Sequence, residues 1–105
     1  MKFDLSETEY QIRSKAEQSF GLKKGHVLDC CVKIVVTVYF EHTSKEKPVH
    51  FLKRSPGLNR IFQQILKKCK GVVWAESSRI CEIVMSKEIG EKSSVFVEVG
   101  VIDDF

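Results

Sequence analysis

The sequence predicts a single α+β domain spanning residues 1–105, in which an antiparallel sheet carries two helices packed on one face. Two observations lead to this class. Two segments repeat apolar residues at helical spacing, and several others alternate apolar and polar residues with the period of a strand. No linker or low-complexity segment divides the chain. The expected order of elements is α-β-β-α-β-β-β.

The first helix is expected at residues 7–19. Ser6 is placed to act as the N-cap, and Glu9, three residues later, is placed to reach back to it as in a capping box. Leu5 and Tyr10 stand at the two positions of a hydrophobic staple. An apolar stripe at spacing four and a terminating glycine complete the pattern: Ile12, Ala16, Phe20 and Gly21.

A long strand is expected at residues 26–42. All its even positions from Leu28 to Phe40 are apolar, whereas the odd positions mix polar and apolar side chains. This period of two, rich in β-branched residues, indicates a strand with one buried face and one half-exposed face. A polar loop at 42–48 and a returning strand at Val49–Lys53 then make a hairpin.

The second helix is expected within SPGLNRIFQQILKKCKG, residues 55–71. Ser55 suits the N-cap and Pro56 the first helical position, and Gly71 suits the end. Cations in the last turn favour the negative end of the helix dipole. The apolar residues form a full amphipathic stripe: Leu58, Ile61, Phe62, Ile65, Leu66 and Cys69.

Three more strands are expected near residues 72–76, 79–86 and 95–101. A tight turn at Ser77-Ser78 would join the first two. Valine alternates with other residues through the last segment, as it does in a strand with one buried face. The final residues, Ile102–Phe105, form a short acidic tail.

Three features of the sequence indicate a cellular location: its cysteines, its N-terminus and the length of its apolar runs. Each cysteine lies in an apolar-patterned segment, which favours buried reduced thiols over disulfides. The N-terminus has no apolar region typical of a secretory signal, and no apolar run approaches the length of a membrane helix. A cytoplasmic or nuclear location and no membrane partner are therefore expected.

Signals for catalysis or cofactor binding are few. No phosphate-cradling glycine motif is present, and the histidines lie at no known motif spacing from a nucleophile. Cys69 has lysines on both sides, but its helical phase places it on the apolar stripe. The cysteines also lack the spacing of a zinc site. We expect no catalytic residue, no metal and no cofactor, and hence no enzyme.

The charge distribution suggests one class of partner. Residues 45–70 hold eight basic residues against one acid, whereas residues 75–105 hold three against seven. Clustered cations near aromatic residues suit single-stranded nucleic acid, particularly RNA. In this alternative the contacts come from Lys45, Lys47, Lys53, Arg54 and Arg60.

A protein-interaction module, acting as a subunit or adaptor of an intracellular complex, is the main expectation. Val35, Thr37 and Tyr39 share the less buried face of the long strand, which is more apolar than a free surface needs. The acidic third could also pair with the basic segment of a second copy, giving a homodimer. Three cations at the start of the second helix are unfavourable to its dipole, so they too are candidate partner-binding residues: Lys53, Arg54 and Arg60.

The run IFQQILKKCKGVV, followed by a strand pair and FVEVGVIDD, resembles the C-terminal half of the translation initiation factor one family. That family is also small, basic and built from helices on a sheet. The resemblance covers less than half of the chain and includes no diagnostic motif. Residues 94–101, at the place of the family's last helix, have a strand pattern here. The resemblance implies RNA binding, and we assign no family from it.

Overall fold

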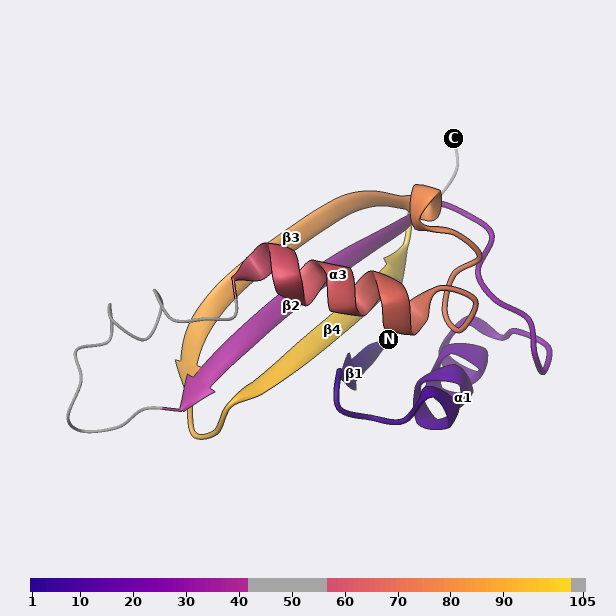
Figure 1. The fold of residues 1–105 in the computed structure, drawn as a ribbon. Coiled ribbons are helices and arrows are strands. Elements are labelled where there is room, and N and C mark those ends of the chain that lie inside the picture. The colour runs from indigo at the N-terminus through magenta and orange to yellow at the C-terminus, as the bar shows by residue number, and fades with distance from the viewer. Residues whose placement is uncertain (42–56, 103–105) are drawn as a thin grey trace.

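The computed structural model describes residues 1–41 and 57–102. It is a small α+β fold with a four-stranded mixed sheet, which confirms the predicted class (Figure 1). The elements are β1 (Lys2–Asp4), α1 (Glu9–Phe20), β2 (Val32–Glu41), α3 (Leu58–Cys69), the short 3-10 helix η1 (Ser77–Arg79), β3 (Ile80–Gly90) and β4 (Ser94–Val101).

The strands lie in the order β1-β4-β2-β3. β4 runs antiparallel to both β1 and β2, but β3 runs parallel to β2. The prediction of a purely antiparallel sheet was therefore wrong. The physical reason is the connection: the chain crosses over through α3 between β2 and β3, and such a helical crossover lets the second strand start again in the same direction.

β2 is the central strand, and its predicted alternation is confirmed. Its odd residues from Lys33 to Tyr39 are half-buried. The strand begins at Val32, later than expected, because Leu28 pairs instead with the segment around Trp74: its amide donates to the Val73 carbonyl at 2.8 Å. Its even residues are all buried in the core: Val32, Ile34, Val36, Val38 and Phe40.

The remaining strands differ from the prediction in two places. The three-residue β1 was not expected, yet it buries Phe3 opposite Val97. Residues 72–76, expected as a strand, form a turn in which the Gly71 amide donates to the Trp74 carbonyl at 2.8 Å. η1 then replaces the expected tight turn at 77–78. The expected strand at Val49–Lys53 lies outside the described residues.

α1 and its N-cap each begin two residues later than predicted. Thr8 is the N-cap and forms the capping box with Gln11, whereas the Ser6 hydroxyl donates to Asp4 at 2.8 Å. Asp4, at the end of β1, thus holds Ser6 in the connecting turn. The staple prediction was also wrong, because Tyr10 is 78% exposed. The glycine stop is confirmed: Gly21 caps the helix with φ 63°.

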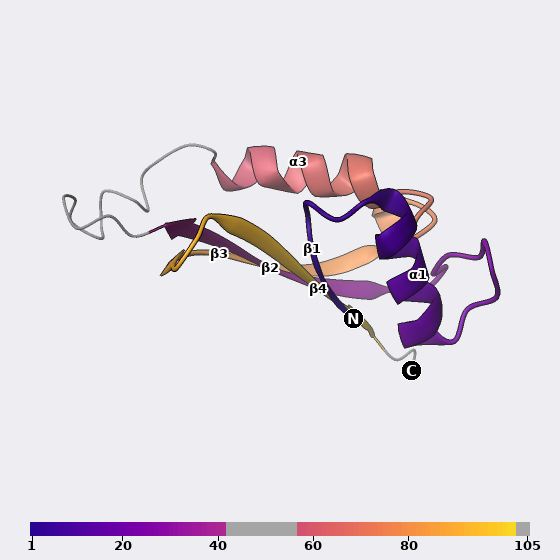
Figure 2. The ribbon, with the colours of Figure 1, turned by 90° about the horizontal axis from the view of Figure 1, so that it is seen from below.

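α3 lies across one face of the sheet, and α1 lies beside the sheet near β1 (Figures 1 and 2). Ile61, Ile65 and Cys69 of α3 are fully buried against the sheet, with the other apolar stripe residues half-buried at their sides. The expected caps Ser55 and Pro56 lie outside the described residues. α1 adds Ile12 and Ala16 to the same core, so the buried residues of both helices and of the sheet form one hydrophobic cluster.

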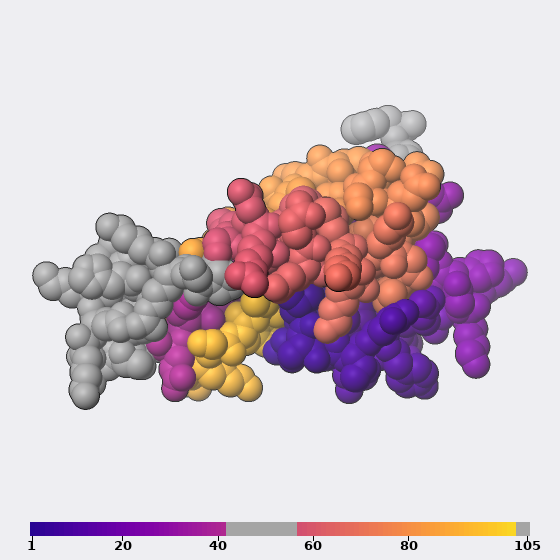
Figure 3. Space-filling view, viewed as in Figure 1, coloured from indigo at the N-terminus to yellow at the C-terminus, as the bar shows by residue number. Residues whose placement is uncertain are grey.

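The space-filling view shows α3 across the middle of this side, with the N-terminal segment next to it and β3 along the rim (Figure 3). Among the described residues, no helix has the length and apolar character needed to cross a membrane.

Candidate functional site

The face of the sheet opposite α3 is called here the outer face, and no described helix lies over it. Side chains alternate along each strand, and the pairing register identifies which of them share this face. In the described part of the chain α3 lies on the other side (Figure 2). The outer-face residues are Lys2, Asp4, Lys33, Val35, Thr37, Tyr39, Glu41, Glu82, Val84, Ser86, Glu88, Gly90, Ser94, Phe96, Glu98 and Gly100.

The centre of the outer face is apolar and aromatic. The rings of Tyr39 and Phe96 meet edge to face, with centroids 6.0 Å apart and planes at 79°. The Lys2 ammonium lies 5.3 Å from the centroid of the Phe96 ring. Val35 and Thr37 are half-buried on the same face. The structure thus brings the predicted residues Val35, Thr37 and Tyr39 together and adds Phe96 to them.

A hollow of about 470 Å³ adjoins Tyr39 where β3 turns into β4. It is lined by Tyr39, Gly90, Glu91, Lys92, Ser94 and Phe96. A Cβ atom added at Gly90 would come within 3.0 Å of the Tyr39 ring, so the glycine lets the ring lie against the backbone. The position of this aromatic side chain is therefore fixed by its neighbours before any partner binds.

The charges around this centre have both signs, with acids in excess. Lys33 and Glu82 form an ion pair at 3.5 Å between β2 and β3. In all, the strands place two cations, Lys2 and Lys33, on the outer face with five carboxylates: Asp4, Glu41, Glu82, Glu88 and Glu98. Glu91 and Lys92 add one charge of each sign at the hollow. This balance disfavours a phosphate backbone, whose binding depends on an excess of lysine and arginine.

The structure does not bring the predicted basic residues onto the outer face. Arg60 is exposed on the first turn of α3, and α3 lies on the side of the sheet opposite the outer face (Figure 2). At the other end of α3, Lys68 is half-buried and donates to the Leu5 carbonyl, which ties the helix to the segment after β1. The other predicted cations, Lys45, Lys47, Lys53 and Arg54, lie outside the described residues.

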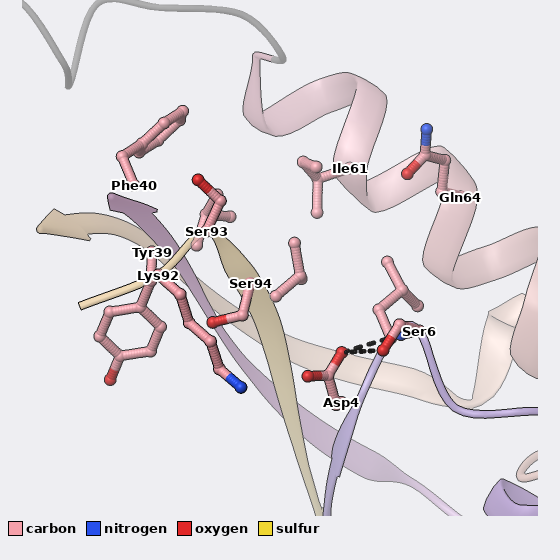
Figure 4. Close-up of a pocket in the computed structure, with 12 residues that line it drawn as sticks. Asp4, Ser6, Tyr39, Phe40, Ile61, Gln64, Lys92, Ser93 and Ser94 are labelled. Carbon is pink, nitrogen blue, oxygen red and sulfur yellow. Dashed lines mark hydrogen bonds between the residues drawn. The ribbon is translucent and has the colours of Figure 1, made fainter. Parts of the chain in front are cut away.

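A second cavity, of about 740 Å³, lies between α3 and the ends of β2 and β4 (Figure 4). Asp4 on its wall accepts hydrogen bonds from the Ser6 amide at 2.9 Å and the Ser6 hydroxyl at 2.8 Å. The backbone hydrogen bond from Ser6 is the main reason that the pKa of Asp4 is lowered. The described residues that line this cavity include Ser6, Ser93, Ser94, Asp4 and Lys92, and they include no histidine or cysteine.

The cysteines differ in their accessibility, and no disulfide joins them. Burial raises the pKa of Cys69 from 9.0 to about 12, although Lys68 acts in the opposite direction. This thiol stays protonated at neutral pH, which is unfavourable for a nucleophile. The expectation of four buried thiols was wrong for Cys81, which is exposed on β3. The described residues contain no group of three or more His, Cys, Asp or Glu placed to hold a metal ion.

Comparison of the chain with protein-family models and with curated proteins finds no match.

Proposed function

We propose that this chain is a non-catalytic protein-interaction module, a subunit or adaptor of an intracellular complex, cytoplasmic or nuclear. Its binding surface is the outer face, with Tyr39 and Phe96 at the centre. The observation that supports this most is an aromatic, apolar centre on a sheet face over which no described helix lies.

The composition of the outer face suits a protein partner. Protein interfaces combine an apolar centre, in which tyrosine is enriched, with a charged and solvated rim. Tyr39 fits the role of central anchor because the Phe96 ring and Gly90 hold it in place. The excess of carboxylates at the rim favours a partner that presents lysine or arginine around an apolar patch.

The test is affinity capture from nuclease-treated cell extract with four forms of the chain: the wild type, one control variant and two outer-face variants. The wild type and Arg60→Gln should retain the same proteins, since Arg60 lies away from the outer face. Tyr39→Ser and Thr37→Glu, each first checked for an unchanged fold by circular dichroism, should lose them. Retention by both outer-face variants, or loss of every captured protein on nuclease treatment, would contradict the proposal.

The second candidate function is binding of single-stranded nucleic acid, and one observation supports it. Two aromatic rings lie on the outer face with the Lys2 ammonium over one of them, an arrangement on which bases can stack. The excess of carboxylates on the same face disfavours nucleic-acid binding, because they repel phosphates. In this alternative the phosphates would need cations from elsewhere, such as Lys45, Lys47, Lys53, Arg54 and Arg60.

Charge removal distinguishes the two candidates. Lys53/Arg54/Arg60→Gln, compared with the control Lys67/Lys70→Gln, should weaken oligonucleotide binding and flatten its salt dependence if nucleic acid is the ligand. The control omits Lys68 because this side chain donates to the Leu5 carbonyl. Under the main proposal neither variant changes the set of proteins that the outer face captures.

A further inference from the structure

The free edge of β3 carries exposed apolar side chains on both of its faces at adjacent positions. Ile83 is 42% exposed and Val84 is 45% exposed. The register with β2 places Ile83 on the α3 side of the sheet and Val84 on the outer face. A partner lying on one face could cover only one of them. A strand added at the edge would contact both.

β3 is open to such an addition along its length. It is the last strand in the sheet order, it is 11 residues long, and Figure 1 shows it at the rim with no described segment beside it. It contains no proline, and its pairing with β2 is regular after the shift at Val32/Lys33. Proline, bulges and a very short length are among the usual protections against edge pairing. β3 has no proline and is 11 residues long, and its one irregularity against β2, at Cys81, lies at the start of the strand.

We propose that β3 pairs with β3 of a second copy of this chain, giving a two-fold symmetric dimer with a continuous eight-stranded sheet, twice the four strands of one copy. Opposed residues of antiparallel strands lie on the same face, so the two-fold axis must pass through a residue and not between two residues. This condition leaves few registers, and the charged and apolar side chains of β3 distinguish them.

An axis at Val84 gives the register that fits. Val84 then faces its own copy on the outer side, and Ile83 faces Met85 of the second copy on the other side. Glu82 lies opposite Ser86, and no like charges are directly opposed. An axis at Met85 would oppose Glu82 to Glu88. An axis at Ile83 would place Glu82 opposite Val84, and an axis at Ser86 would place Glu88 opposite Val84, so neither gives Val84 an apolar neighbour. Directly opposed like charges destabilise a strand pair.

This inference names a partner for the β3 edge and does not rest on binding by the outer face, whose test uses other residues. The experiment is sedimentation equilibrium of the full chain, from nanomolar to near-millimolar concentration under reducing conditions. The wild type should show a reversible change from the mass of one chain to the mass of two. A wild type that stays monomeric throughout would overturn the proposal.

Charge substitutions at the axis test the register. Val84→Glu and Val84→Lys each place two like charges opposite one another, and each should weaken the dimer on the order of 100-fold. An equimolar mixture of the two variants should restore it, because glutamate then faces lysine. Val101→Glu is the matched control, since Val101 is 43% exposed but lies on β4. Dimers unaffected by Val84→Glu, or no recovery on mixing, would also overturn the proposal.

Discussion

β2 and β3 are the two longest strands of the molecule, with 10 and 11 residues, and they lie side by side in parallel register. Both have many apolar residues. In β2 every even residue is buried, whereas β3 has no residue that is fully buried. The register pair Ile34 and Ile83 shows the contrast on one face: Ile34 is 0% exposed and Ile83 is 42% exposed.

The difference follows from the positions of the two strands in the sheet. β2 has β4 on one side, β3 on the other and α3 above it, so its inner side chains are enclosed. Among the described strands, β3 has a neighbour on one side only. Alternation along a strand therefore determines which face a side chain takes, but the number of neighbouring elements determines how much of it is buried.

The largest expected effect comes from truncating the two register partners. Ile34→Ala should lower the free energy of unfolding by about 2–5 kcal/mol, because it leaves a cavity in a close-packed core. Ile83→Ala should lower it by less than about 1 kcal/mol, because its side chain is already in contact with solvent. Urea denaturation measures both.

The comparison is best made in the Val84→Glu background, so that dimer formation does not add to the stability of the Ile83 variant. Equal losses for the two truncations would show that β3 is as enclosed as β2, and hence that another part of the chain covers it.

The helix above β2 offers the next test, with two neighbouring residues. Ile65 is 0% exposed, whereas Leu66 is half-buried at the side of the stripe. Ile65→Ala should lower the free energy of unfolding by about 2–5 kcal/mol. Leu66→Ala should lower it by about half as much, because part of the Leu66 side chain is in contact with water and contributes little hydrophobic stabilisation. A larger loss from Leu66→Ala would mean that α3 is rotated about its axis relative to the sheet.

The sequence predicted β2 and α3 well because each has a long, uninterrupted apolar period that matches one kind of element. It did not predict that β3 runs parallel to β2, since strand direction depends on how the connection crosses the sheet and not on the strand's own residues. Residues 72–76 were mistaken for a strand because their valines and Trp74 are apolar. Their burial comes instead from a turn packed after α3, with Gly71 at φ 73°.

The candidate site was predicted in part, for a similar reason. Val35, Thr37 and Tyr39 followed from the odd positions of β2. Phe96 was missed as a member of the site, although its position out of phase with the buried valines of β4 was a usable signal. Arg60 was grouped with these residues by charge, but sequence offers no measure of which side of the sheet a helix covers.

The reactivity of the cysteines offers a chemical test of which regions are enclosed and which are open to solvent. Cys69, the last residue of α3, is buried and its pKa is raised to about 12, whereas Cys81 is exposed on β3. Iodoacetamide at mildly alkaline pH should therefore modify Cys81 in the native chain and leave Cys69 unmodified, as mass spectrometry of peptides would show. Modification of both at similar rates would contradict the enclosure of Cys69.

The same shift predicts a pH dependence of stability. The folded pKa of Cys69 lies above the ordinary value of 9.0, so its contribution is fully present below pH 9.0 and is lost as the pH rises toward about 12. In that window the unfolded state releases a proton that the folded state retains, and the slope from this group is at most about 1.4 kcal/mol per pH unit. Cys69→Ala should have a shallower alkaline slope than the wild type. Parallel slopes would mean that Cys69 ionises equally in both states.

The smallest expected effect concerns the ion pair that joins the two strands. Lys33 and Glu82 lie 3.5 Å apart on the outer face, and their side chains are 43% and 54% exposed. Because water and salt screen an exposed pair, a double-mutant cycle with Lys33→Met and Glu82→Gln should give a coupling energy of about 0.2–1 kcal/mol. The coupling should decrease further in high salt, since screening shortens the range of the attraction. A larger, salt-insensitive coupling would indicate that the pair is shielded from solvent, and hence that the outer face is covered where β2 meets β3. In that case the enclosure of β2 by its neighbours would not be enough to explain why β3 keeps its register, and the ion pair between the strands would contribute to it as well.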